Sequence, residues 1–195
     1  MGLEFNSQIT ASARNLLRKY HGDEKHADCV CQNALKLFDV MKEEMGLDDH
    51  ARLLLEVAAI LHDIGIFVHI NHHNVHSHYI IKHSEIFGLS ETDRNLVSEI
   101  AKFHRGKLLP QDDEGFALLP RIHRMTILKL TAVLRVVDAL DRSHSQEFSE
   151  VEMELSGDML NIKTASRKNT VLENLALSEK GELFESVFGY KVVLG

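Results

Sequence analysis

Helical periodicity along the first 145 residues constrains the fold more than any other feature of the sequence. Apolar residues recur at three- and four-residue steps over residues 27–45, over 53–61, and most regularly over 127–140. Only two prolines occur in 195 residues, so little interrupts these patterns. The sequence therefore predicts a mainly helical protein whose amphipathic helices pack around one hydrophobic core.

The limits of the helices follow from turn and capping residues. Gly46 is expected to end the first core helix, and a shorter helix is expected over roughly residues 77–87. Ser90 and Asp93 have the spacing of a capping box at the start of the next helix. Residues 106–120 contain glycine, proline and acidic residues, which predicts an exposed loop.

The pattern changes after about residue 148. Apolar and polar residues alternate over 151–155 and again over 160–164, with a turn between them, which predicts a β-hairpin. A helix and a short apolar strand at residues 190–194 follow. We therefore expect two parts, a helical domain over residues 1–147 and a small α+β subdomain over residues 148–195.

Charge and hydropathy exclude two classes of partner. A formal net charge of −7 argues against bulk nucleic-acid binding. The longest apolar stretches, such as residues 53–61, are too short to cross a bilayer, and no leader peptide opens the sequence. A cytoplasmic protein without a membrane partner is expected. Cys29 and Cys31 are expected to be reduced and structural.

Histidine is the unusual component, because seven of the thirteen histidines fall between residues 62 and 83. A histidine-rich segment hints at metal binding. The pair His62-Asp63 ends a strongly apolar helix, while His26 and Asp138 should face inward from the first and last helices. Burying histidines and carboxylates together is costly unless a charge compensates them. A divalent cation accepts both kinds of ligand.

Two further histidines could complete a site for two metals. His76 stands at the start of the third helix and His104 ends the fourth, so a bridging Asp63 would let them hold a second ion. Otherwise, His76 and His104 would be polar side chains that line the same cleft. The remaining histidines His72, His73 and His78 are expected to lie mostly at the rim or in solvent, with His73 as the first candidate among them for an extra ligand.

A phosphate substrate would need cationic donors. The candidates are Arg105, Lys129, Arg135 and Arg142. By their three- and four-residue spacing, Arg135 and Arg142 share a helix face with Asp138 and would flank a bound ligand. For Arg105 and Arg142, a surface ion pair is the alternative. Asp141 is expected to cap a turn or to pair with Arg142 and Lys129 rather than to bind metal.

The order His26, His62-Asp63, Asp138 resembles the HD superfamily of metal-dependent phosphohydrolases. More closely, the chain is similar to the C-terminal HD-like module of the exopolyphosphatase/guanosine pentaphosphate phosphatase family. The segments that carry this likeness are residues 19–21, 61–65, 76–81, 103–106, 134–144 and 183–189. The resemblance covers essentially the whole chain and implies a mainly α protein, with an HD-domain helical core and a small C-terminal α+β appendage.

The resemblance also implies a metal-dependent phosphohydrolase in which a metal-activated water attacks phosphorus. One divalent ion would be held by His26, His62, Asp63 and Asp138, and a second by Asp63, His76 and His104. The expected catalytic residues are His62, Asp63, Arg105 and Lys129, and the expected phosphate ligands are Arg105, Lys129, Arg135 and Arg142. The substrate would be a phosphorylated small molecule, a nucleotide or polyphosphate. Mn, Fe, Co, Ni, Zn or Mg would suit such ligands.

One departure from the family leaves an alternative open. Its members usually carry two N-terminal actin-like domains, in which polyphosphate or guanosine pentaphosphate is cleaved, whereas this sequence begins at the helical module. The named activities therefore do not transfer automatically. The alternative is a non-catalytic module that binds polyphosphate, an alarmone or a partner protein; a third interpretation is a dimerisation domain. The sequence leaves the oligomeric state open, with a homodimer as the commonest outcome for such chains.

Overall fold

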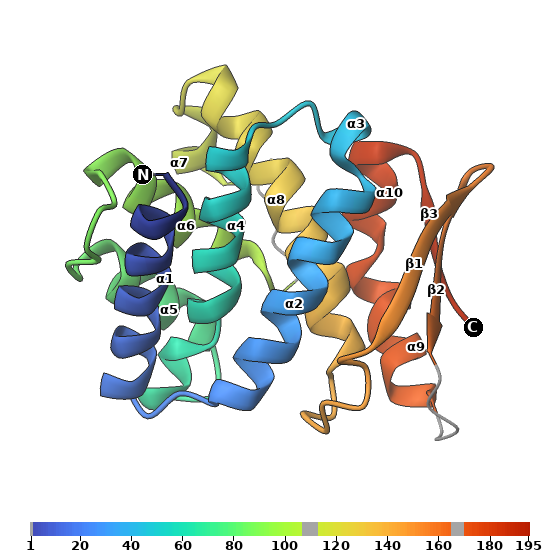
Figure 1. The fold of residues 1–195 in the computed structure, drawn as a ribbon, viewed down its shortest axis with the longest axis horizontal. Helices are drawn as coiled ribbons and strands as arrows, with labels where there is room; N and C mark the ends of the chain where they lie inside the picture. The colour runs from blue at the N-terminus through green and yellow to red at the C-terminus, as the bar shows by residue number, and fades with distance from the viewer. Residues whose placement is uncertain (1, 107–112, 165–169) are drawn as a thin grey trace.

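The computed structural model describes residues 2–106, 113–164 and 170–195, and most of them are helical (Figure 1). The helices are α1 (Gly2–Lys19), α2 (Glu24–Val40), α3 (Lys42–Met45), α4 (Asp49–Leu61), α5 (His73–Lys82), α6 (Glu91–Phe103), α7 (Glu114–Ala117), α8 (Arg121–Leu140), α9 (Val171–Lys180) and α10 (Glu182–Phe188). A short 3-10 helix, η1 (Ile64–Phe67), joins α4 to α5. The strands are β1 (Val151–Ser156), β2 (Met159–Thr164) and β3 (Lys191–Leu194). The prediction of a mainly α protein is confirmed.

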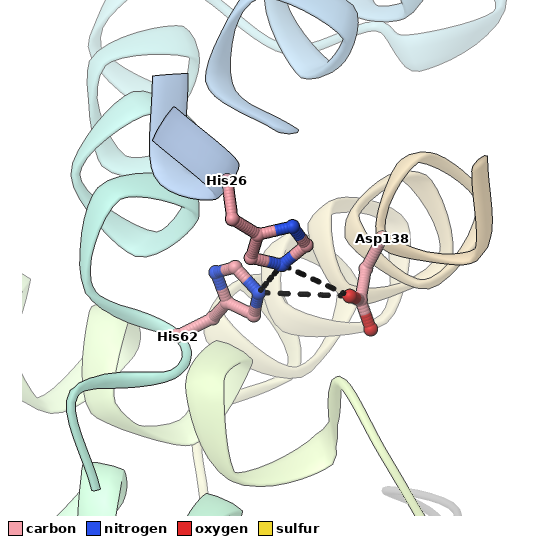
Figure 2. A group of neighbouring side chains, drawn as sticks. All are labelled: His26, His62 and Asp138. Carbon is pink, nitrogen blue, oxygen red and sulfur yellow. Dashed lines mark hydrogen bonds and ion pairs between the residues drawn. The ribbon is translucent and has the colours of Figure 1, made fainter. Parts of the chain in front are cut away.

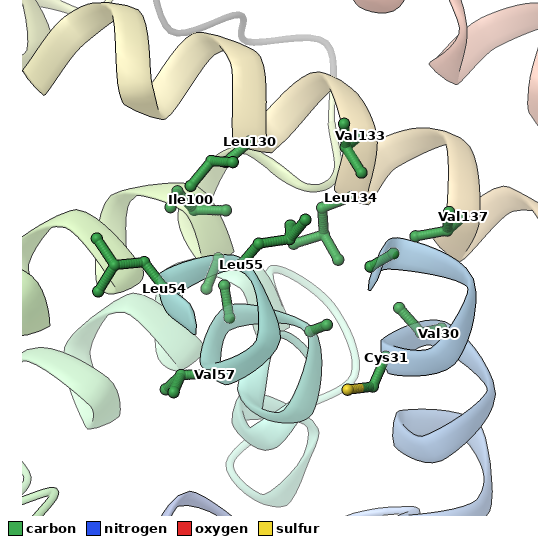
Figure 3. Packing of buried hydrophobic residues seen from close by; sticks show 14 of the residues in the cluster. Val30, Cys31, Leu54, Leu55, Val57, Ile100, Leu130, Val133, Leu134 and Val137 are labelled. Atoms are coloured by element: carbon green, nitrogen blue, oxygen red, sulfur yellow. The ribbon is translucent and has the colours of Figure 1, made fainter. Parts of the chain in front are cut away.

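Helix α4 is the centre of the helical part. It packs against α1, α2, α6 and α8, and of residues 53–61 only Glu56 is not fully buried. A helix that is apolar on every side is stable only when other helices surround it. Figure 3 shows Leu55 of α4 between side chains of α2, α6 and α8. This packing fixes the C-terminal end of α4, where His62 and Asp63 follow.

Helix α1 was not expected from the sequence. Its buried side chains Ile9, Ala13, Leu16 and Leu17 lie on one face at three- and four-residue spacing. That face packs against α4. None of the described helices combines the length and the apolarity that a membrane span requires.

Two predicted segments differ from the structure. Helix α5 covers His73–Lys82 instead of residues 77–87, so it begins earlier and ends at the C-cap His83. In the expected loop, residues 107–112 lie outside the described residues. The rest includes α7, which begins because Asp113 accepts a hydrogen bond from the Phe116 amide. Most of residues 113–120 are exposed as predicted, but the segment contains this one helical turn and buries the Phe116 side chain.

Other local predictions are confirmed. At the start of α6, the Ser90 hydroxyl accepts a hydrogen bond from the Asp93 amide, and the Asp93 carboxylate accepts one from the Ser90 amide, which completes the capping box. Cys29 and Cys31 are free and buried, and burial raises the pKa of each thiol to about 12. Such thiols are structural rather than reactive.

The C-terminal part is a three-stranded sheet with two helices. Strands β1 and β2 form the predicted antiparallel hairpin, and β3 pairs parallel to β2 at the sheet edge. Strand β1 packs on α2, while α9 and α10 pack on α8. Buried apolar side chains of both parts therefore belong to one hydrophobic cluster. The division between residues 147 and 148 stays a prediction.

Candidate metal centre

The ends of several helices meet at a cluster of histidines and aspartates. His26 lies in the first turn of α2, His62 caps the end of α4, and Asp138 lies in the last turn of α8 (Figure 2). Asp63 follows His62, and His104 caps the end of α6. Helices α4, α6 and α8 bring their C-terminal ends to the cluster. A helix C-terminus carries partial negative charge, so the arrangement favours a bound cation.

The first group of ligand atoms comes from three buried side chains. The Nε2 atoms of His26 and His62 lie 3.2 Å apart. The Asp138 Oδ1 atom is 3.5 Å from the His26 Nε2 and 3.6 Å from the His62 Nε2. These three atoms lie within 4.8 Å of one another, as the ligands of a single ion must. They could therefore hold one metal ion.

Asp63 joins this group to two further histidines. Its Oδ1 is 2.9 Å from the His73 Nε2 and 3.3 Å from the His104 Nε2, which lie 3.3 Å from each other. Its Oδ2 is 3.8 Å from the His26 Nε2. His62, Asp63 and His104 form a second group of atoms close enough to share an ion. Asp63 thus lies between two sets of histidine nitrogens.

The opposite nitrogen of each ring has a partner of its own. The Nδ1 contacts are His26 with Asp141 Oδ2 (2.8 Å), His62 with Ala59 O (2.8 Å), His73 with Ile70 O (2.9 Å) and His104 with Ala101 O (2.6 Å). Because these partners are acceptors, each Nδ1 must donate a proton. In a neutral imidazole this leaves the lone pair on Nε2, which is the atom that points into the cluster. Four converging lone pairs and two carboxylates are a donor set that fits a divalent cation.

The protonation states of the cluster also favour the binding of a divalent cation. Burial disfavours a charged carboxylate, but the positive charge of the nearby Lys180 and the adjacent rings of His26 and His62 hold the pKa of Asp138 well below its usual range. The pKa of Asp63 is also held well below its usual range, against burial, by His62, His104 and His73. Burial lowers the pKa of His104 to about 4. At neutral pH, both aspartates are anions and His104 is neutral, as metal ligands must be.

Metal binding is expected to release about one proton at pH 8. Although burial favours the neutral ring, hydrogen bonds to Asp138 and Asp141 raise the pKa of His26 to about 10. The ring therefore carries a proton on Nε2 in the metal-free protein at pH 8, and an ion must displace it. Affinity should rise about tenfold per pH unit between about pH 7 and pH 9. Calorimetric titration of Mn²⁺ in buffers of different ionisation enthalpy measures the proton count.

A matched pair of variants isolates this proton. The variant His50→Gln removes an exposed histidine that pairs with Asp93 outside the cluster, so it should leave the released proton unchanged. In the variant His26→Gln, metal binding should no longer release this proton. A binding heat that does not depend on the buffer would contradict the assignment.

His73 takes the position that His76 was expected to occupy. Because α5 begins at His73, the His73 ring reaches Asp63 and His104. His76 lies one turn further along and is only half-buried. A Cβ built on Gly65 would lie 2.8 Å from the His76 Cβ, so His76 packs against the backbone that follows Asp63. The structure brings His73, and not His76, into the cluster.

Of the four expected phosphate ligands, the structure places one against the cluster. The Arg105 Nη1 lies 3.3 Å from the His73 Nδ1. The buried Arg135 donates instead to the carbonyls of Phe103, at 3.1 Å, and Gly106, at 3.2 Å and 3.3 Å. It thereby anchors the end of α6, and burial lowers its pKa. Arg142 is exposed beyond the end of α8.

Lys129 lies away from the cluster. Its amino group donates to the Met45 carbonyl at the end of α3. The nine residues from Lys129 to Asp138 make about two and a half turns of helix, so the two side chains leave α8 on opposite faces. The expectation that Lys129 is catalytic and binds phosphate therefore has no support in this geometry.

Asp141 has a different partner from those expected. It is fully buried and pairs with the His26 Nδ1, while its Oδ1 accepts a hydrogen bond from the Gln146 amide at 2.8 Å. It contacts neither Arg142 nor Lys129 in this way, so that pairing was wrong, whereas the hydrogen bond from the Gln146 amide gives Asp141 the expected capping role in the turn. A carboxylate on the far nitrogen of a ligating histidine fixes the ring and strengthens it as a ligand. Asp141 thus orients His26.

Two residues of the site were missed from the sequence. The buried Lys180, at the end of α9, forms an ion pair with Asp138. The His144 ring stacks on His26 with ring centroids 3.8 Å apart, and its Nδ1 is 3.2 Å from the Asp23 Oδ2. His26, Asp63 and His144 form a third group that could hold an ion. The motif at residues 134–144 contained His144, but no local pattern marked Lys180.

Comparison with known proteins gives the family. The model of Ppx/GppA phosphatase, domain III, matches residues 10–184. A "Guanosine-5'-triphosphate,3'-diphosphate pyrophosphatase" of Vibrio vulnificus is 28% identical over 149 residues, which are 74% of this chain and 28% of that protein. Its namesake from Photobacterium profundum is 25% identical over 134 residues, 66% of this chain and 25% of its own length. The chain thus spans about a quarter of these relatives. It belongs to the Ppx/GppA phosphatase family and corresponds to domain III, as the sequence motifs predicted.

Proposed function

We propose that this chain is a metal-dependent phosphohydrolase that acts on a phosphorylated small molecule, nucleotide or polyphosphate. The observation that carries the proposal is the convergence of four histidine Nε2 atoms on the carboxylates of Asp63 and Asp138. Each of these rings has its other nitrogen bonded to a buried acceptor. Such orientation of imidazoles is typical of metal ligands. The relatives are pyrophosphatases of phosphorylated nucleotides, which supports a phosphorylated compound as the ligand class.

The proposed ligands form two sets that share Asp63. His26, His62, Asp63 and Asp138 would hold one ion, and Asp63, His73 and His104 would hold a second. When bound, divalent cations polarise phosphoryl oxygens and lower the pKa of water, which supplies a nucleophile at neutral pH. The sharing of Asp63 supports a site in which both ions act on one phosphate.

The remaining groups of the site have roles that follow from their positions. Asp63 belongs to the cluster and also lines a pocket open to solvent, so the phosphate would reach the ions beside it. Arg105, at the edge of the cluster, would neutralise a phosphoryl oxygen. Asp141 and three backbone carbonyls hold the histidine rings in place. Asp138, paired with Lys180, stays charged while buried.

Two histidines of the same helix provide the first test. We expect the untreated protein to contain stoichiometric metal and to hydrolyse members of a panel of phosphomonoesters, phosphodiesters and phosphoanhydrides. The variant His73→Gln should lose metal and lower hydrolysis by about 10- to 100-fold. The variant His76→Gln, one helical turn away, should keep both. Metal analysis and initial rates measure the two effects.

The outcome separates this proposal from its alternative. Bound metal without hydrolysis across the panel would favour a non-catalytic binding module. Absence of metal from the protein and no metal-stimulated hydrolysis would contradict the metal centre itself. Loss of metal in His76→Gln but not in His73→Gln would restore the ligand set expected from the sequence.

A further inference from the structure

A cavity of about 350 Å³ opens directly beside the metal centre. Its lining includes Asp63 and His144, which belong to groups that could hold an ion, and also Tyr20, His21, Gly22, Asp23, Ile66 and Phe67. The volume lies at the lower end of the range of small-molecule sites, about 300–1,000 Å³. It suits one compact group attached to a phosphate, and it leaves little room for a long chain.

The wall of this cavity is aromatic. Phe67, in η1, is 56% exposed although it is a large apolar residue. The Tyr20 ring supports it edge to face at 5.2 Å, and the His21 ring lies nearly parallel to it at 6.2 Å. These contacts hold the Phe67 ring in one orientation while part of it faces the cavity. A fixed, exposed ring is a platform on which another flat ring can stack.

The backbone at the rim is strained. His21 and His144 adopt φ values of 51° and 52°, in the left-handed region that side chains other than glycine rarely occupy. Such a conformation is unfavourable for a residue with a side chain and persists where the surroundings impose it, often at ligand sites. Both residues line the cavity. The strain therefore coincides with the place where a ligand would be recognised.

The charges of the cavity disfavour a polyanion. Its described lining includes the carboxylates of Asp23 and Asp63 but no lysine or arginine, and its basic side chains are the imidazoles of His21 and His144. Because Asp63 would be balanced by the metal, any phosphate beyond the one held there would face the Asp23 carboxylate with no lysine or arginine in the described lining to neutralise it. Carboxylates accept hydrogen bonds from the N–H groups of a base or the hydroxyls of a ribose.

We propose that this cavity binds the base of a nucleoside monophosphate by stacking on Phe67, while the single phosphate lies at the metal centre. The inference rests on the proposed function, because the phosphate must be held by the cluster. It narrows the substrate class from phosphorylated compounds in general to nucleotides with one phosphate. Phe67 would then determine specificity without contacting the reacting atoms.

The test compares two ligands that share a phosphonate and differ in the base. They are the non-hydrolysable 5′-methylenephosphonate of adenosine and the same ribose phosphonate without adenine, titrated calorimetrically into Mn²⁺-loaded protein. We expect the adenosine compound to bind at least about tenfold more tightly. The variant Phe67→Ala should lose this preference with unchanged affinity for the ribose compound, and Phe67→Tyr should retain it.

The control is a second exposed phenylalanine. Phe87 is 55% exposed and packs edge to face on Phe5, away from the cavity lining. Phe87→Ala removes a phenyl ring that is as exposed as that of Phe67 but lies outside the cavity. The preference for the adenosine compound should therefore stay at its wild-type value. Urea unfolding of each variant shows whether a loss of binding reflects loss of folding.

Three outcomes would overturn the inference. Equal affinity of the wild type for the two phosphonates would exclude a base site and leave the phosphohydrolase proposal intact. Tighter binding of tripolyphosphate than of the adenosine compound would assign the cavity to a polyanion. No binding of either phosphonate to the metal-loaded protein would remove the phosphate site, and the proposed function would fail with the inference.

Discussion

Asp63→Asn is expected to lower kcat/KM for phosphate hydrolysis by at least about 1,000-fold, which corresponds to about 4 kcal/mol of transition-state stabilisation. The amide has the size of the carboxylate but no charge, so it cannot balance a divalent cation. Because Asp63 faces His26 on one side and His73 and His104 on the other, the substitution affects both ligand sets. The bound metal should decrease along with the activity.

The control for this variant is another Asp→Asn substitution. Asp39 pairs with Arg52 on the surface, with both hydrogen bonds at 2.8 Å, and Asp39→Asn should leave metal content and hydrolysis unchanged. Rates across the phosphate panel and metal analysis of both variants make the comparison. Wild-type turnover in Asp63→Asn would place the chemistry outside this cluster.

The parts of the site that lie in sequence motifs could be predicted. His62-Asp63 follows a helix that is apolar on all sides, and His26 and Asp138 occupy inward faces of regular helices. Helical periodicity alone places such side chains in one core. The spacing of the buried residues of α1 could also have predicted that helix. The nine-residue separation of Lys129 and Asp138 could likewise have shown that their side chains lie on opposite faces of α8.

The other parts of the site could not be predicted, because they depend on contacts between segments far apart in the sequence. His73 and His76 are three residues apart, and which of them reaches Asp63 depends on where α5 begins after η1. The pairing of Asp141 with His26 and that of Lys180 with Asp138 join residues far apart in the chain. A single sequence contains no local pattern that predicts such pairs, because they result from the packing of α9 and α2 around α8.

Lys180→Met is expected to destabilise the metal-free protein by about 3–5 kcal/mol, because it leaves the buried Asp138 carboxylate without its cation. Lys180 is 9% exposed and Asp138 is 6% exposed, so water screens this pair little. A divalent ion beside Asp138 would supply the missing positive charge. The loss of unfolding free energy should therefore be smaller when the protein is saturated with Mn²⁺. Urea unfolding with a chelator and with excess Mn²⁺ measures both values.

Thermodynamic linkage makes this prediction quantitative. If the loss is about 2 kcal/mol smaller with metal, Lys180→Met must bind the ion about 30-fold more tightly than the wild type does. Lys163 provides the control, because its ion pair with Glu154 is exposed and Lys163→Met should leave the stability of both states nearly unchanged. An equal loss with and without metal would mean that Lys180 only anchors α9. A smaller loss with metal would mean that the amino group and the ion compete for Asp138, so that the C-terminal helices sense whether the metal centre is filled.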